Sequence, residues 1–182
     1  MSAGPPRREW SLLRRSPTWA VVALGLCGWL LWDSWPDVAY YLSPLRPIDL
    51  GVPGAYHLEA ARPNRLVRIA GAPAAAVAIT DARAREERAV LGLRGLNLAV
   101  DRPGRGTPAA VFEGRLLPAA RQADYAPAVA ALRDRGWAAG DRWMVLRDGE
   151  RPRTRWAPLA WSAALLLLAA VNARALLKSL LA

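Results

Sequence analysis

The sequence predicts a membrane protein of the α+β class, with two transmembrane helices flanking a small antiparallel β-barrel or roll of the OB type that carries one helix. Two apolar runs near the chain ends, residues 17–35 and 159–181, are the first observation. The nineteen residues of the first run make a helix of about 28 Å, close to the roughly 30 Å hydrocarbon core of a bilayer. The second observation is a series of short apolar strands between turn residues in the middle of the chain.

These patterns divide the chain into five segments. We expect a cytoplasmic tail at 1–16, a first transmembrane helix with its outer aromatic end at 17–42, a Pro/Gly-rich linker at 43–64, a periplasmic β-rich domain at 65–155, and a second transmembrane helix with a cytoplasmic basic end at 156–182. The linker carries four prolines and two glycines and has no sustained periodicity.

The composition limits the functional classes. The 182 residues are 53% apolar and 22% charged, which leaves room for one modest domain beside membrane segments. The net charge of +10 comes from arginines spread along the chain and from Lys178. Because the arginines do not cluster into a stripe, we attribute them to the coding bias of a GC-rich bacterium and not to nucleic-acid binding. A basic face for anionic lipid headgroups is the alternative. Because Cys27 is the single cysteine, an intrachain disulfide and a CxxCH haem site are excluded.

The charges next to the apolar runs predict how the chain is threaded. The tail carries Arg7, Arg8, Arg14 and Arg15 against Glu9, which by the positive-inside rule places the N-terminus in the cytoplasm of a bacterium. No small-residue cleavage site follows, so we expect an uncleaved signal anchor in the inner membrane. The second helix returns the C-terminus to the cytoplasm. Arginines at 151–155 oppose this orientation, but the long segment before them translocates largely regardless of charge.

Aromatic and basic side chains mark the expected membrane interfaces, where amphipathic rings settle at headgroup depth. The aromatic residues are Trp19, Trp29, Trp32, Trp35, Tyr40, Tyr41, Trp156 and Trp161. Arg174 and Lys178 lie four residues apart on one face, where their long stems allow the charges to snorkel to the cytoplasmic headgroups. We therefore expect the lipid bilayer to be one partner of this chain.

Small residues recur at helical spacing in both apolar runs and predict helix-packing faces. They are Ala20, Ala23, Cys27, Ala163, Ala170 and Ala173. Such faces fit either two helices that pack on each other or two helices that dock on subunits of a larger membrane complex, and the sequence leaves both open.

Short strands are expected in the central domain at 65–71, 75–80, 88–93, 96–100, 110–117 and 141–150. One helix over 125–135, capped by Asp124 and ended by Gly136, precedes the last of these strands.

The sequence predicts no catalytic, cofactor-binding or metal-binding residue and therefore no enzyme. GxSxG, HExxH, P-loop and GxGxxG motifs are absent from the sequence. His57 is the single histidine, and an enzyme would need a cluster of His57 with Glu59 and Glu113. Asp33 is expected to be an interfacial carboxylate that reaches water.

The order of helix, exported β domain and helix, together with the RGW tripeptide at 135–137, resembles the Surf1-type cytochrome oxidase assembly factors. The resemblance implies a non-catalytic accessory or assembly subunit of a bacterial inner-membrane complex. Packing-competent helices and the missing catalytic motifs predict the same role. The alternative is a periplasmic ligand- or lipid-binding module, whose pocket would be lined by converging arginines.

Overall fold

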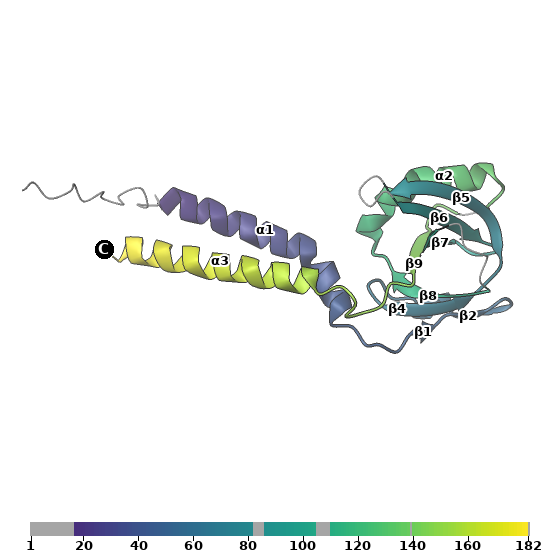
Figure 1. The fold of residues 1–182 in the computed structure, drawn as a ribbon, viewed down its shortest axis with the longest axis horizontal. Helices are drawn as coiled ribbons and strands as arrows, with labels where there is room; N and C mark the ends of the chain where they lie inside the picture. The colour runs from purple at the N-terminus through teal and green to yellow at the C-terminus, as the bar shows by residue number, and fades with distance from the viewer. Residues whose placement is uncertain (1–16, 82–85, 105–109, 139, 182) are drawn as a thin grey trace, which may run out of the picture. The chain divides into compact units, whose positions relative to one another are not determined.

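The computed structural model describes residues 17–81, 86–104, 110–138 and 140–181 (Figure 1). The described chain forms two compact units. The first combines residues 17–35 with 157–181, and the second comprises Pro36–Trp156. The basic tail at 1–16, the tip of the run at 82–85 and the loop at 105–109 lie outside the described residues.

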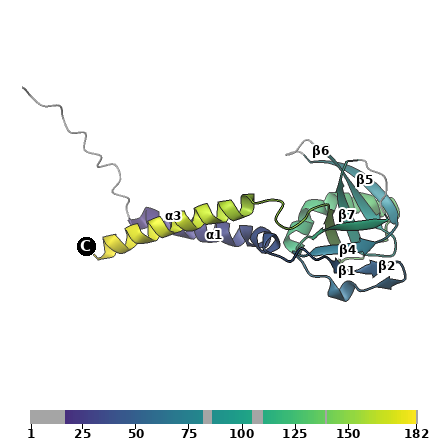
Figure 2. The ribbon, with the colours of Figure 1, turned by 60° about the horizontal axis from the view of Figure 1, so that its bottom comes forward.

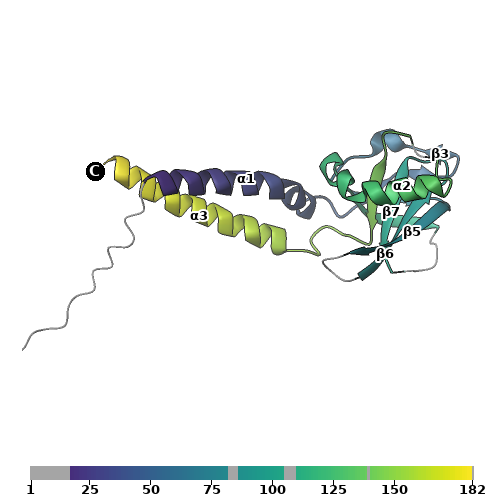
Figure 3. The same ribbon diagram turned by 90° about the horizontal axis from the view of Figure 1, so that it is seen from above.

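The first unit is a helix pair formed by most of α1 (Pro17–Tyr41) and by α3 (Ala157–Leu180). The two helices run side by side and antiparallel in all three ribbon views (Figures 1–3). Ala20 and Cys27 of α1 are buried seven residues apart, as are Leu165 and Asn172 of α3. This spacing is that of a coiled-coil seam, in which one residue in every three or four faces the partner helix.

One helix among the described residues is long and apolar enough to cross a membrane, namely Ala157–Ser179, with a mean hydropathy of 1.7. The expectation of two flanking transmembrane helices is therefore wrong at α1. The helix is 25 residues long, so its length is sufficient. Its tryptophans count as weakly polar on the hydropathy index, and Asp33 and Ser34 lower the mean further.

The second unit is built on a seven-stranded sheet in the order β1-β4-β8-β9-β7-β6-β5. The strands are β1 (Ile48–Asp49), β4 (Leu66–Ala70), β5 (Pro73–Asp81), β6 (Glu86–Leu93), β7 (Leu98–Pro103), β8 (Val111–Leu116) and β9 (Met144–Asp148). β4 to β9 confirm the six strands expected from the apolar runs between turn residues. Figure 2 shows how strongly the sheet curls between β5 and β1.

The prediction of an antiparallel barrel or roll is wrong because the sheet is mixed. β1 pairs with β4 in parallel, and β7 pairs with β9 in parallel. Parallel strands need a long crossover connection. The segment between β8 and β9 supplies one, because the 3-10 helix η3 (Ala119–Tyr125) and the helix α2 (Ala126–Asp134) return the chain so that β9 enters between β7 and β8.

The segment expected to be a linker is folded as part of the second unit. Besides β1 it contains β2 (Gly51–Val52), β3 (Ala55–Tyr56) and the 3-10 helix η2 (Leu58–Ala60). β2 and β3 form a separate two-stranded hairpin. Gly51 has φ +92° and a Cβ there would lie 2.1 Å from the carbonyl oxygen of Ala55, so the close approach of β2 and β3 at this position requires glycine.

Two apolar clusters cover the two faces of the sheet. One contains the fully buried Phe112 and Ile69. The other lies under α2 and contains Leu132 and Trp137. Trp137 packs directly over Gly92, where a Cβ would come within 2.4 Å of the indole Cγ atom.

The residue that caps the start of α2 differs from the sequence prediction. It begins after Tyr125 with no side-chain cap, so the expected Asp124 cap is wrong. Gly136 follows the helix with φ +88°, as expected of a residue that ends it.

Candidate functional site: a buried arginine network

The most unusual feature of the second unit is a buried guanidinium on β8. Alternation along β8 points Phe112 and Leu116 into one apolar cluster, so Arg115 points to the opposite face of the sheet, where it is also buried. Only 6% of the Arg115 side chain is exposed. Burying an isolated charge is expensive, so a position of this kind is occupied only where opposite charges and hydrogen-bond acceptors surround it.

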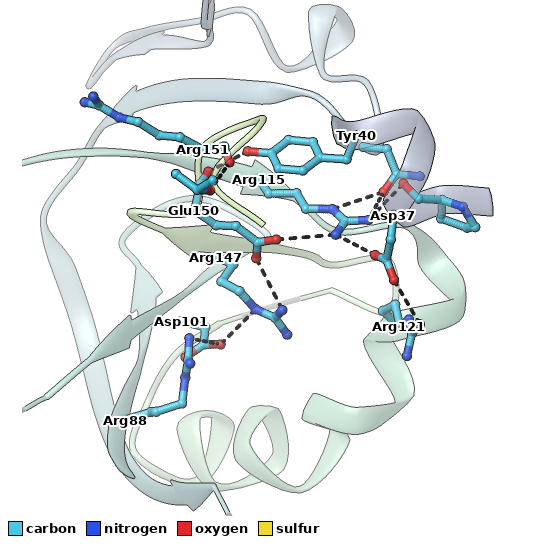
Figure 4. Close-up of polar contacts among 12 residues, drawn as sticks. Asp37, Tyr40, Arg88, Asp101, Arg115, Arg121, Arg147, Glu150 and Arg151 are labelled. Carbon is cyan, nitrogen blue, oxygen red and sulfur yellow. Dashed lines mark hydrogen bonds and ion pairs between the residues drawn. The ribbon is translucent and has the colours of Figure 1, made fainter. Parts of the chain in front are cut away.

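Acceptors surround Arg115 on every side (Figure 4). Its Nη1 atom donates to Asp37 Oδ1 at 2.7 Å and to Glu150 Oε1 at 3.4 Å. Its Nη2 atom donates to the carbonyl oxygen of Pro36 at 3.1 Å, and both Nη2 and Nε donate to Asn64 Oδ1, at 2.8 and 3.3 Å. The guanidinium lies 4.7 Å from the centre of the Tyr40 ring, within the range of a cation–π contact.

Arg115 also supplies a cation that α1 lacks. No basic residue occurs in the last turn of α1. Because helix C-termini carry partial negative charge, a cation next to the last turn is favourable. Arg115 approaches this turn at Pro36, Asp37 and Tyr40, which belong to the same compact unit as β8. The network therefore ties the last turn of α1 to the sheet.

A second buried charge, Asp101 on β7, continues the network. Its side chain is 1% exposed. Arg88 on β6 binds it with two parallel hydrogen bonds of 2.8 and 2.9 Å, the bidentate geometry typical of a strong arginine–carboxylate pair. The Tyr125 hydroxyl donates to the same carboxylate.

Arg147 on β9 joins the two halves. Its Nη1 atom lies 3.3 Å from Glu150 Oε2, its Nη2 atom donates to the Tyr125 hydroxyl at 3.0 Å, and its Nε atom lies 3.6 Å from Asp101 Oδ2. A continuous chain of contacts thus runs from Arg88 to Asp37 (Figure 4).

The pKa values follow from this environment. Burial, followed by the hydrogen bond to Asp101, raises the pKa of Tyr125 to about 12. Burial, followed by the charge of Glu150, raises the pKa of Tyr40 well above its usual range. Burial lowers the pKa of Arg147, but the interactions with Tyr125, Glu150 and Asp101 outweigh it and the net shift is upward. Both phenols therefore stay protonated and act as donors at neutral pH.

Most charges of this network are paired within the protein. The guanidinium groups of Arg88, Arg115 and Arg147 face the carboxylates of Asp37, Asp101 and Glu150. A fourth guanidinium, that of the exposed Arg121, lies 3.7 Å from Asp37 Oδ2. The arrangement consequently suits a structural role. A site for an external anion would instead need cationic donors that protein carboxylates leave available.

The residues expected to anchor the chain lie in two environments. Trp19, Trp29, Trp32, Trp35, Trp156 and Trp161 are exposed, as are Arg174 and Lys178, and Tyr41 is half-buried. Tyr40 is different, because it is buried in the second unit, where its hydroxyl donates to the carbonyl oxygen of Glu150.

The residues expected to pack the helices divide in a similar way. Ala20 and Cys27 are buried and Ala23 is half-buried, whereas Ala163 and Ala170 are exposed and Ala173 is half-buried. The face that α3 buries is instead formed by Ser162, Leu165 and Asn172. The Oγ atoms of Ser34 and Ser162 lie 3.4 Å apart within this helix pair.

The structure pairs His57 with Glu59 and pairs Glu113 with a different residue. His57 Nδ1 lies 3.6 Å from Glu59 Oε1, and both side chains are exposed. Glu113 instead pairs with Arg151 at 3.3 Å. Among the described residues, no group of three or more His, Cys, Asp or Glu side chains could hold a metal ion. Asp33 is exposed.

Sequence reasoning missed the arginine network entirely. The available signal was a charge inside an apolar strand, as in the LAVDRP of β7 and the VFEGRL of β8. That signal does not identify the partner of either charge, because the partners come from distant elements.

No protein-family model, curated protein or solved structure matches this chain. The RGW tripeptide has a local explanation in the fold. Gly136 ends α2, and the indole Nε1 of the buried Trp137 donates to the carbonyl oxygens of Leu93 and Leu96 at 2.9 and 3.1 Å. The resemblance to Surf1-type assembly factors stays a prediction.

Proposed function

We propose that the protein is a non-catalytic accessory or assembly subunit of a bacterial inner-membrane complex. In this proposal Ala157–Ser179 is the membrane segment, and the exposed face of α1 docks on an apolar helix of a partner subunit. The exposed face of α1 is the observation that carries the proposal. Val22, Leu26, Trp29 and Trp32 are 53%, 53%, 63% and 81% exposed.

Two properties of α1 favour protein over lipid as the neighbour of this face. A large contiguous apolar surface marks an interaction site. Yet α1 does not reach the hydropathy of a membrane-crossing helix, because polar groups such as Asp33 and Ser34 interrupt it. A partner protein can cover the apolar side chains and also offer hydrogen bonds to the polar ones.

The non-catalytic part of the proposal is supported by the arginine network. Arg88 binds the buried Asp101 and Arg115 binds the half-buried Asp37, in direct contacts of 2.7–2.9 Å. Carboxylates held in this way are committed to structural partners, whereas a general acid or base needs access to a substrate.

We further propose that the domain lies on the periplasmic side. Arg174 and Lys178 stand in the C-terminal part of α3, and the positive-inside rule assigns this end to the cytoplasm. The single cysteine allows a direct test. In a Cys27→Ala background, Arg94→Cys in the domain should react with a membrane-impermeant maleimide in intact cells, and Ser179→Cys should not. The reverse pattern would place the domain in the cytoplasm.

A ligand-binding module is less well supported. The sequence predicts for such a module a pocket that is lined by converging arginines. A pocket of about 400 Å³ is present, but it is lined by Val52, Pro53, residues 70–73 and Ala110, none of which is an arginine. The best-buried arginine, Arg115, is bound by protein acceptors instead.

Site-specific photocrosslinking tests the accessory role. A photoreactive phenylalanine analogue at Trp32 should give an adduct with a second polypeptide in native membranes. The matched control is the same analogue at Ala20, which is 2% exposed and should give no such adduct. Adducts confined to lipid at both Trp29 and Trp32 would overturn the proposal.

A further inference from the structure

The edge strand β5 is open to pairing with another chain. β5 spans nine residues and is the last strand of the sheet order, where its hydrogen-bonded neighbour among the described residues is β6. The opposite end of the sheet is the two-residue β1. The only charged residue of β5 itself is Asp81, at its end. A long strand edge presents unpaired N–H and C=O groups in a row, and native proteins usually shorten, charge or cover such edges.

The two faces of β5 differ in burial. Ala75, Val77 and Ile79 pack against the apolar cluster under α2. Ala74, Ala76 and Ala78 alternate with them and are exposed. Cross-strand neighbours interact on each face of a sheet, so these small side chains leave room for larger ones on an added strand.

A cation lies on the open edge. The Nη1 atom of Arg135 donates to the carbonyl oxygen of Ala76 at 2.7 Å, and the Arg135 side chain is exposed. Pairing of two β5 strands from two copies would bring the two Arg135 side chains together, whereas an acidic segment would complement them.

The pocket described above begins where β5 begins. Its lining joins Ala72 and Pro73 to the tip of the β2–β3 hairpin at Val52 and Pro53. Its volume of about 400 Å³ and apolar lining suit an apolar side chain. In strand addition, main-chain hydrogen bonds supply affinity and pockets for side chains supply specificity.

We propose that β5 accepts an extended acidic segment of a partner polypeptide as an additional strand of the sheet, with one apolar side chain of that segment in the pocket. Arg135 then exchanges its contact with Ala76 for an acidic side chain of the incoming strand. The edge of β5 belongs to the second unit, and the exposed face of α1 that carries the accessory role belongs to the first. The result for one proposal therefore does not decide the other.

The test uses the full chain in detergent and a defined probe, a short labelled peptide of alternating valine and threonine with a central glutamate. Fluorescence anisotropy should report binding, and hydrogen–deuterium exchange should report new protection of the β5 amides. The same peptide with N-methyl groups on alternate amides should not bind, because it lacks the donors for strand pairing. No binding of the unmethylated peptide, or equal binding of both, would overturn the proposal.

Two variants test the backbone pairing and the charge preference separately. The hydrogen bond to Arg135 places the backbone groups of Ala76 on the open edge, so Ala76→Pro removes an edge donor and should abolish binding while the β5–β6 pairing remains. Arg135→Glu should weaken binding of the glutamate peptide by about fivefold, the scale of an exposed ion pair, and strengthen binding of the matching lysine peptide. If Arg135→Glu changes neither affinity, charge complementarity at this edge is refuted.

Discussion

Arg115 on β8 places its Nη1 atom 2.7 Å from Asp37 Oδ1, seventy-eight residues earlier in the chain. This contact joins the last turn of α1 to the middle of the sheet within one compact unit. A buried ion pair is no guarantee of net stability, because its desolvation cost offsets the attraction. Removing Arg115 is nevertheless expensive, since among the described residues it leaves Asp37 and Glu150 with only their longer contacts, to Arg121 at 3.7 Å and to Arg147 at 3.3 Å.

Arg115→Met should therefore destabilise the domain by about 3 kcal/mol, because Glu150 and Asp37 lose their shared cation. Arg115→Lys should fall between this variant and the wild type, since an ammonium keeps the charge but cannot reproduce the planar fork of donors. Urea unfolding of the full chain in detergent measures both. Arg94→Ala is the exposed control and should change stability by less than about 0.5 kcal/mol. If Arg115→Met behaves like the control, the network does not stabilise the last turn of α1.

The Tyr125 phenol should lose its proton at a higher pH than an ordinary tyrosine. Its pKa of about 12 in the fold exceeds the value of about 10 in an unfolded chain. The fold therefore favours the neutral phenol, and this stabilisation is fully present below about pH 10 and is lost as the pH rises through about 12. The ultraviolet absorbance titration of the wild type minus that of Tyr125→Phe should have its midpoint near 12. A midpoint near 10 would mean that Tyr125 is not held by Asp101.

Gly92 should not tolerate a methyl group. A Cβ at this position would lie 2.4 Å from Trp137 Cγ, and the indole is fixed by its own hydrogen bonds to Leu93 and Leu96. Gly92→Ala should cost about 1–3 kcal/mol, the usual cost of overpacking a core. Gly28→Ala is the matched control, because no atom lies within 4 Å of a Cβ at Gly28. Equal stability of the two variants would show that Trp137 does not cover β6.

The thiol of Cys27 should react slowly. It is 2% exposed, whereas the neighbouring Leu26 is 53% exposed. In detergent, maleimide labelling of Cys27 should be about tenfold slower than labelling of Leu26→Cys in a Cys27→Ala background, because the buried thiol reacts only after local opening. Equal rates would contradict the packing of α1 on α3.

Local patterns predicted the elements better than their arrangement. Short apolar runs between turn residues located β4 to β9, because each strand buries one or both faces and its own residues carry that signal. The parallel pairing of β7 with β9 depends on where the crossover through α2 returns the chain, and no local pattern encodes it. The partners of Arg115 and Asp101 likewise could not be predicted from the sequence, because they belong to elements that lie far apart in the chain.

The packing faces of the helices were also predicted only in part. Small residues predicted Ala163 and Ala170 on the packing face of α3, but the buried face carries Ser162, Leu165 and Asn172. In a helix as uniformly apolar as α3, composition alone does not fix which side meets a partner. Tryptophans made the first apolar run look like a membrane interface in the sequence, yet they lower its hydropathy below that of a spanning helix.

The mass of the native particle tests the accessory role most directly. The protein, expressed at its natural level and extracted in mild detergent, should migrate in a complex larger than one chain of 19.8 kDa and contain a second polypeptide. A Trp29→Ser, Trp32→Ser double variant should lose that polypeptide while the domain stays folded. A lone monomer with no second polypeptide in the wild-type sample would contradict the account.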